Sequence, residues 1–208
     1  FRSNVEWAWD TASEAVKTTM EDKIPRLSHM LFQGMFFIIT PALICGAFAE
    51  RMKFSTMVVF SILWATVVYC PLCHWVWDQG ILAYGSPRAI AGGSLDFAGG
   101  AVVHISSGVS ALVCSLVMGR RLGFGSEAMR PHILTYTTLG AAMLWVGWFG
   151  FNAGSQLGSD GVTASAFAAT HFSAAAGTLA WAGLEGFLRG KDRKSTRLNS
   201  SHVALSRM

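Results

Sequence analysis

Five long apolar runs limit what this 208-residue chain can fold into. They cover residues 27–49, 54–77, 97–118, 133–155 and 162–188, and the first, second and fourth contain no Asp, Glu, Lys or Arg. Each run is long enough to cross a bilayer as a helix, which takes about 20 residues. Only 13% of the chain is charged, against about 25% in soluble domains. The sequence therefore predicts an all-α, polytopic membrane helix bundle with five transmembrane helices.

Basic residues mark alternate connections between these runs. The connections after the first, third and fifth runs carry Arg51, Lys53, Arg120, Arg121, Arg130, Arg189 and Lys191. The other connections hold Asp78, Arg88 and Asp160, and residues 1–26 hold five acidic against four basic residues. Short cytoplasmic loops carry an excess of Lys and Arg. We therefore expect a multi-pass protein of the inner or plasma membrane, with residues 1–26 outside and the loops at 50–53 and 119–132 in the cytoplasm.

The two ends of the chain differ from the membrane domain, which we place at residues 27–190. Residues 1–26 are interpreted as an extracytoplasmic loop, with a short surface helix in VEWAWDTASEAVKTTM as the alternative. The polar tail, residues 191–208, holds five basic residues and one acidic residue, so it carries the whole net charge of +4. The basic balance therefore does not predict nucleic-acid binding. The tail resembles translated sequencing-adapter read-through and is expected to be non-native, with a cytoplasmic linker as the alternative. Because the chain starts at Phe1, we interpret it as an internal fragment.

The stretch CPLCH, residues 70–74, matches the C-x-x-C-H pattern for covalent haem attachment. It lies at the end of an uncharged run, where a haem would need room among packed helices, so coincidence is the favoured interpretation. A redox disulfide remains open. A second Cys/His pair for zinc is missing nearby, and the sequence has no G-x-S-x-G, phosphate loop or H-E-x-x-H. The sequence thus predicts no enzyme, no cofactor and no metal site.

Polar residues inside or beside the runs are the candidates for function, because such residues are costly in lipid and usually face a bundle interior or a pathway. They are Asp96, His104, Asn152, Ser155, His171 and Glu185. Asp96 precedes a helical run and is expected to cap it. His104 either lines a pathway or hydrogen-bonds to a neighbouring helix. Helix packing and an interfacial end charge are sufficient explanations for His171 and Glu185.

Aromatic residues cluster near the outer ends of the runs. They are Phe32, Phe36, Trp75, Trp77, Trp148, Phe149 and Phe151. By themselves they indicate an interfacial belt or a packed core. If several converge in a vestibule, their ring faces would attract a small desolvated cation.

Taken together, these segments resemble the ammonium transporter family (the Amt/Mep/Rh superfamily), in its bacterial Amt-type branch. The resemblance covers about residues 27–190 and rests on FQGMFF, LICGAFAERMKFS, HWVWDQG, LDFAGGAVVHISSG, MGRRLGFGSEAMRPH and WVGWFGFNAGS. It implies an eleven-helix inverted-repeat fold, of which the five runs would be the third to seventh helices. It also implies ammonium or ammonia as substrate, a homotrimer at full length, and a PII-type signal protein as a candidate partner.

The resemblance also assigns roles to individual residues. An external recruitment site would use Phe36, Trp77 and Ser155, and an aromatic gate below it would use Phe36 and Phe151. His104 would be one of two pore histidines, and the second would lie in a later helix that this chain lacks. The expected structural neighbours of the site are Asp96, Trp148 and Asn152.

These expectations form one mechanism. Ammonium and potassium are alike in charge and size, but only ammonium can lose a proton. An apolar pore excludes ions, whereas a neutral imidazole pair would pass ammonia and offer a proton relay. We expect the fragment alone not to transport. The alternative function is an ammonium sensor that uses the same membrane domain to control a cytoplasmic signalling domain, and a membrane scaffold without substrate is disfavoured.

Overall fold

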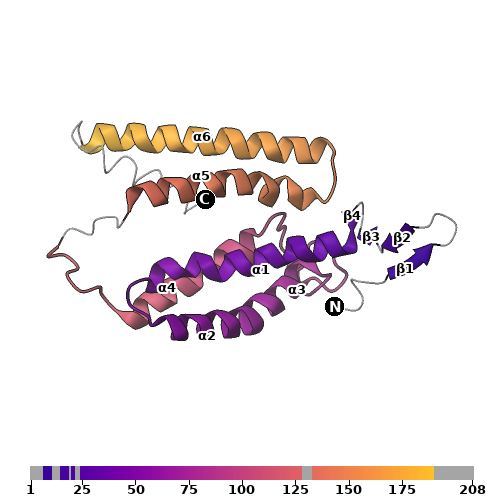
Figure 1. Cartoon of the computed structure of the whole chain (residues 1–208), viewed down its shortest axis with the longest axis horizontal. Coiled ribbons are helices and arrows are strands. Elements are labelled where there is room, and N and C mark those ends of the chain that lie inside the picture. Colours follow the sequence, from indigo (N-terminus) through magenta and orange to yellow (C-terminus); the bar gives the residue numbers. More distant parts are fainter. Residues whose placement is uncertain (1–6, 11–14, 19, 22–23, 128–132, 190–208) are drawn as a thin grey trace. The chain divides into compact units, whose positions relative to one another are not determined.

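The computed structural model describes residues 7–10, 15–18, 20–21, 24–127 and 133–189 of the chain (Figure 1). The chain divides into two compact units, Phe1–Phe124 and Gly125–Met208, which are described separately. The described residues contain five long helical stretches, as the sequence predicts. Three of these stretches, all in the first unit, are long and apolar enough to cross a membrane by length and composition.

The first unit contains three helical rods. The first rod is α1 (Arg26–Phe48), the second joins α2 (Phe54–Trp64), η2 (Ala65–Tyr69) and α3 (Cys70–Trp77), and the third joins η4 (Gly100–Ile105) and α4 (Ser106–Met118). A short turn, η3 (Ile90–Gly92), lies in the loop between the second and third rods. The colours in Figure 1 show that α1 and α4 run in the same direction and the α2–α3 rod runs in the opposite one. This alternation is the one expected for consecutive membrane crossings.

Proline explains the π-helical segment in the middle of the second rod. Pro71 lacks an N–H group and its ring would collide with the carbonyl four residues earlier in a regular α-helix. In η2, directly before this proline, the N–H of Cys70 instead donates to the carbonyl of Ala65, five residues earlier. The wider turn lets the rod continue past the proline as α3.

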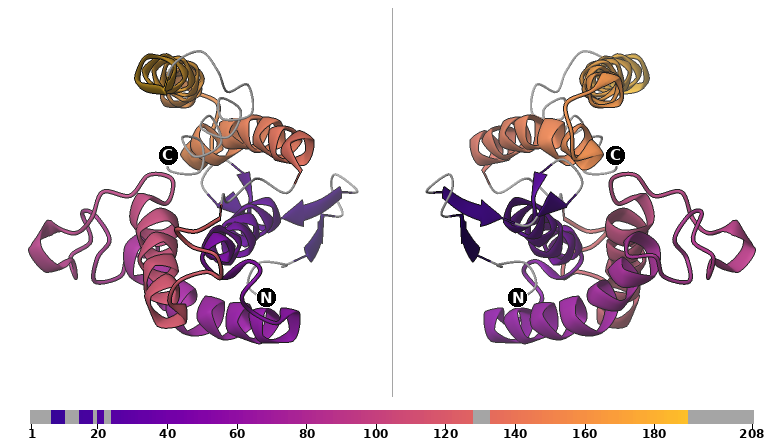
Figure 2. Two further views of the ribbon diagram at one scale, coloured as in Figure 1. Left: turned by 90° about the vertical axis from the view of Figure 1, so that its left-hand side faces the viewer. Right: turned by 90° about the vertical axis from the view of Figure 1, so that its right-hand side faces the viewer.

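The core of the first unit lies between α1 and α4, which pack along each other (Figures 1 and 2). The largest side chains that are fully buried there are Ile44, Val102, Val103 and Thr40. The hydroxyl of Thr40 donates to the carbonyl of Phe36 at 2.5 Å. The indole N–H of Trp64 donates to the hydroxyl of Ser110 at 2.9 Å and ties α2 to α4. The Thr40 hydroxyl and the Trp64 indole in this core are therefore both hydrogen-bonded, as buried polar groups usually are.

Arg51 joins the ends of α1 and α4. Its guanidinium donates to the carbonyl of Gly119 at 2.6 Å and to the carbonyl of Ala47. Gly119 has a φ of 71°, a left-handed conformation that glycine adopts without steric cost. The loop at 50–53 and the start of the segment after α4 therefore lie at the same end of the unit. That this end is cytoplasmic remains a prediction.

The second unit is a pair of antiparallel helices, α5 (Leu134–Asn152) and α6 (Gly161–Arg189), joined through a short turn, η5 (Gly154–Gln156) (Figure 1). The Asp160 carboxylate accepts the N–H groups of Val162 and Thr163 at 3.0 and 3.1 Å and caps α6. The predicted runs 133–155 and 162–188 therefore become helices with ends shifted by a few residues. Neither is among the helices that are apolar enough to span a membrane by length and composition alone.

The described part of the N-terminal segment forms strands, so the alternative of a surface helix there is wrong for these residues. β1 (Trp7–Asp10) pairs antiparallel with β2 (Ala15–Thr18), with Trp7 opposite Thr18 and Asp10 opposite Ala15. β3 (Met20–Glu21) pairs with β4 (Ile24–Pro25). Tryptophan, valine and threonine favour extended pairing. The tail, residues 191–208, lies outside the described residues.

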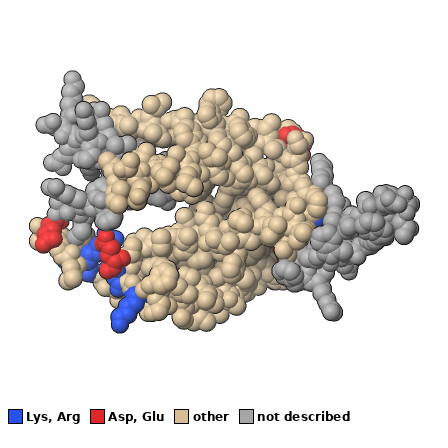
Figure 3. Space-filling view, viewed as in Figure 1, with Lys and Arg blue, Asp and Glu red and all other residues tan. Residues whose placement is uncertain are grey.

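Residues without a charged side chain cover the visible surface of the helices. Figure 3 shows tan over the lengths of the helices, with blue and red confined to places near their ends. Large hydrophobic residues on all three rods of the first unit are exposed, among them Ile38, Ile62 and Leu116. Such a surface matches a bilayer rather than water as the surrounding solvent.

Candidate functional site

Two aromatic residues from different rods meet at the end of α3. Trp77 is the last residue of α3, and its ring lies edge-to-face with that of Phe36 on α1, with centroids 5.4 Å apart. Phe32, one turn before Phe36, makes a second edge-to-face contact with Phe36 at 5.0 Å. Phe36 is almost fully buried, whereas Trp77 is half-buried. The predicted recruitment aromatics of the first unit are therefore neighbours.

Asp96 caps the rod that begins beside this aromatic pair. One carboxylate oxygen accepts the N–H groups of Gly99 and Gly100 at 2.5 and 3.0 Å, and the other accepts those of Ala101 and Val102 at 2.8 and 3.0 Å. These donors would otherwise be unsatisfied at a helix start. The negative charge also suits the positive end of the helix dipole. The local capping role expected for Asp96 is thus present.

The capped helix starts later than predicted. The sequence analysis began this run at 97, but η4 begins at Gly100 because the chain first turns at Gly99, which has a φ of 102°. That turn brings the N–H groups of residues 99–102 within reach of the carboxylate, so Asp96 acts from three residues before the N-cap position.

Asp96 also contacts the aromatic pair, through its backbone. The indole N–H of Trp77 donates to the carbonyl oxygen of Asp96 at 3.1 Å. One residue therefore links the end of α3 to the start of η4. Both carboxylate oxygens of Asp96 already accept two N–H groups each, which accords with a structural role rather than direct contact with a cation.

His104 lies on the π-helical segment η4, eight residues after Asp96. Its backbone N–H donates to the carbonyl of Gly99, five residues earlier, at 2.9 Å. The imidazole is half-buried. π-helical turns often occur at functional sites because they alter the angle at which a side chain leaves the helix. The structure thus places His104 on a rod whose start is fixed by Asp96.

The remaining predicted residues gather at the C-terminal end of α5 in the second unit. The rings of Trp148 and Phe151 stack with centroids 4.9 Å apart. The amide of Asn152 donates to the hydroxyl of Thr170 at 3.0 Å and ties α5 to α6. The hydroxyl of Ser155 donates to the carbonyl of Phe151 at 2.6 Å. The Ser155 oxygen retains lone pairs that could accept a hydrogen bond from a cation.

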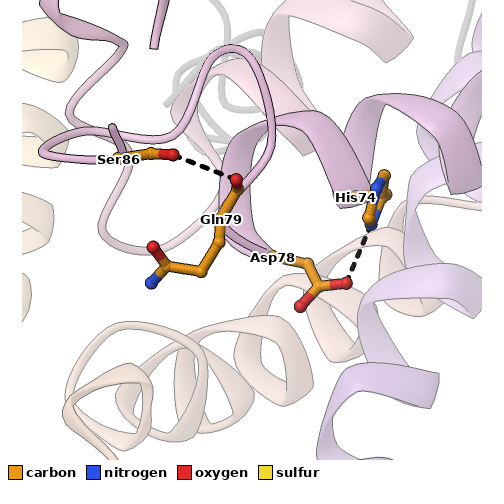
Figure 4. A network of polar contacts seen from close by, with 4 residues as sticks. All are labelled: His74, Asp78, Gln79 and Ser86. Atoms are coloured by element: carbon orange, nitrogen blue, oxygen red, sulfur yellow. Dashed lines mark hydrogen bonds and ion pairs between the residues drawn. The ribbon is translucent and has the colours of Figure 1, made fainter. Parts of the chain in front are cut away.

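The sequence analysis did not predict two polar contacts that lie near Trp77 in the chain. Nδ1 of His74 and Oδ2 of Asp78 lie 2.8 Å apart, and the hydroxyl of Ser86 donates to the carbonyl of Gln79 at 3.0 Å (Figure 4). The spacing of a His and an Asp four residues apart on a helix could have indicated the first contact. Nothing in the sequence indicated the second.

The C-x-x-C-H stretch and His171 have other surroundings. Cys70 and Cys73 are free thiols on α3. Across the residues that the structure describes, no group of three or more His, Cys, Asp or Glu side chains is arranged to hold a metal ion. His171 stacks with Trp145 on α5, with centroids 5.9 Å apart. This contact accords with the helix-packing role expected for His171.

Comparison with known proteins identifies a family. The model of the Ammonium Transporter Family matches residues 3–204. The chain is 49% identical over 185 residues to an ammonium transporter of Bacillus subtilis, covering 89% of this chain and 43% of that protein. It is 42% identical over 193 residues to one of Mycobacterium bovis, covering 92% and 40%, and 46% identical over 157 residues to one of Aquifex aeolicus, covering 76% and 35%. The chain thus spans about two fifths of the curated relatives it matches.

Proposed function

This chain belongs to the ammonium transporter family, and on that premise we propose that it forms the recruitment site and part of the pore of a transmembrane ammonium transporter. Its relatives are named as transporters, so the chain is a multi-pass membrane protein and not an enzyme. The resemblance stated from the sequence motifs is confirmed at the level of the family. The activity, the substrate and the roles of single residues are proposals.

The observation that carries the proposal is the connection made by Asp96. Its carbonyl accepts the Trp77 indole N–H, and its carboxylate caps the helix that bears His104. A cation attracted to the aromatic pair would therefore be next to the start of a helix with an imidazole about one turn further along. This order, an aromatic site followed by a histidine, is what recruitment and deprotonation of ammonium require.

Recruitment relies on aromatic faces and one hydroxyl. The ring faces of Phe36 and Trp77 attract a cation that has lost part of its hydration shell. From the resemblance to the family we carry over two further roles: Ser155 would accept a hydrogen bond from the ammonium ion, and Phe36 and Phe151 would serve as the gate. Trp148 and Asn152 hold the end of α5 through their contacts with Phe151 and Thr170.

Selectivity for ammonium over potassium follows from the proton that only ammonium can lose. Charge and size do not distinguish ammonium from potassium, and an apolar pore penalises both ions heavily. Ammonium that transfers its proton at the outer site continues as neutral ammonia, and potassium has no such route. His104, paired with a second histidine from a later helix, lines the pore and offers a relay for the proton.

The orientation and the partners are further proposals. The alternation of the three rods and the shared end of the loops that begin at 50 and 119 support placing the start of α1 and those loops on opposite sides of the membrane. The basic residues in those loops favour the cytoplasm for them and the outside for residues 1–26. We extend this to the inner or plasma membrane of the cell, to a homotrimer at full length, and to a PII-type signal protein as a candidate cytoplasmic partner.

Trp77→Leu in the full-length protein tests recruitment. A desolvated cation–π contact contributes about 1–2 kcal/mol, so we expect the KM for methylammonium uptake to rise by about 5- to 30-fold. The matched control is Trp75→Leu, two residues earlier on α3 and exposed, which should leave KM within about twofold. An unchanged KM for Trp77→Leu at wild-type protein levels would refute the recruitment role.

A further inference from the structure

The loop that follows α3 folds back onto the turn that carries Trp77. The N–H of Leu82 donates to the carbonyl of Trp75 at 2.9 Å, and that of Asp78 donates to His74 at 3.2 Å. Gly80 lies so close to the helix that a Cβ atom there would be 2.5 Å from the Cα of Trp75. The loop backbone is thus in direct contact with the last turn of α3.

The first residue of this fold-back is held in an unfavourable conformation. Gln79, two residues after Trp77, has a φ of 55°, a left-handed conformation that costs free energy for any residue except glycine. Such a conformation persists only where surrounding contacts hold it. The contact that holds Gln79 comes from the loop itself.

Ser86 supplies that contact (Figure 4). Ser86 as a whole residue is 8% exposed, and its hydroxyl donates to the carbonyl of Gln79 at 3.0 Å and accepts the N–H of Arg88 at 3.2 Å. A hydroxyl with both a donor and an acceptor partner is fixed in direction. We call the hydrogen-bonded residues Gln79 and Ser86 the α3 clasp.

The neighbouring contact between His74 and Asp78 is a weaker restraint on the same turn. The side chains of His74 and Asp78 are 61% and 77% exposed, and exposed pairs contribute little because solvent screens them and two flexible side chains must be ordered. The buried hydroxyl of Ser86 is therefore the main side-chain restraint on the residues that directly follow Trp77.

We propose that Ser86 is a positioning residue for ammonium recruitment, because the α3 clasp holds the end of α3 and with it the indole of Trp77 against Phe36 and the carbonyl of Asp96. The inference rests on the proposed role of Trp77 in binding the cation. A site that is held in its binding geometry does not lose affinity to reorganisation. Gln79 and Ser86 lie in the loop after α3 and not on the rod that bears His104, so we expect the clasp to set the affinity for the substrate and not the rate of passage.

The test is uptake of methylammonium by the full-length protein carrying Ser86→Ala. Loss of one buried hydrogen bond should raise KM by about two- to tenfold, with a maximal rate per folded protein within about twofold of wild type. Adding Gln79→Gly should bring KM back to within about twofold of wild type, because glycine adopts a φ of 55° without the Ser86 bond. The matched control is Thr66→Val, which deletes a hydroxyl that donates to the carbonyl of Ile62 on the same rod.

The outcomes separate this inference from the proposed function. A raised KM for Ser86→Ala that Gln79→Gly corrects supports the clasp. An unchanged KM for Ser86→Ala, when Trp77→Leu raises KM, overturns the clasp alone, and so does an equal loss of maximal rate with no change in KM. An unchanged KM for Trp77→Leu overturns the recruitment role and the clasp with it. If Ser86→Ala does not accumulate, Ser86→Cys keeps the side-chain size with a weaker donor, and an unchanged KM in that variant also overturns the clasp.

Discussion

Replacing Asp96 with alanine should prevent the full-length transporter from accumulating as a folded protein. The carboxylate accepts four backbone N–H groups at the start of η4, and a hydrogen bond to a charged group contributes about 1.5–3 kcal/mol. Together these bonds approach the whole stability of an ordinary folded domain, about 5–15 kcal/mol. The measurement is the amount of monodisperse protein extracted from membranes, with its melting temperature where enough survives.

Two other variants control this experiment. Asp78→Ala removes an exposed carboxylate whose hydrogen bond is to His74, and it should leave yield and melting temperature close to wild type. Asp96→Asn keeps one acceptor oxygen and should give an intermediate yield. Wild-type yield and an unchanged melting temperature for Asp96→Ala would show that the N–H groups of residues 99–102 do not depend on this side chain.

Replacing His104 with alanine should leave the protein folded but nearly inactive. The imidazole is half-buried on η4, and the backbone hydrogen bonds of that rod are made by main-chain atoms that alanine retains. If it relays the proton that ammonium loses, its removal takes away a general acid–base group, which typically contributes at least about 100-fold in rate. We expect the maximal rate of methylammonium uptake to fall by about that factor, while the melting temperature stays close to wild type.

His171→Ala is the matched control, because His171 is also an imidazole in a predicted membrane helix but stacks with Trp145 on α5. We expect its uptake to stay within about twofold of wild type. If His104→Ala takes up methylammonium as fast as His171→Ala does, His104 does not relay the proton in the pore. A loss in both variants that follows a loss of folded protein would point to helix packing for both histidines.

The helices could be predicted because lipid leaves the backbone few alternatives. A chain that crosses a bilayer must satisfy its N–H and C=O groups internally, so an uncharged run such as 54–77 becomes one continuous rod even with Pro71 inside it. Capping by Asp96 could be predicted from its place before an apolar run. The order of the site residues along the chain came from the resemblance to the family, which the comparisons confirm.

The remaining features depend on contacts that a linear pattern does not contain. The start of η4 at Gly100 depends on the turn at Gly99 that carries the backbone over the Asp96 carboxylate. The Ser86 hydroxyl meets the Gln79 carbonyl only because the loop folds back onto α3. The Trp77 indole donates to the backbone carbonyl of Asp96 and so joins two rods. Every residue has a backbone carbonyl, so the type of residue at position 96 does not indicate this bond.

The most direct measurement of the central claim is uptake of labelled methylammonium into liposomes that contain the full-length protein, with and without a large excess of potassium. We expect saturable uptake that unlabelled ammonium competes away and that potassium does not affect, because only the ammonium ions can give up a proton before entering the apolar pore. Uptake no greater than in empty liposomes would contradict transport and favour the sensor function. Equal competition by potassium would contradict selection by deprotonation.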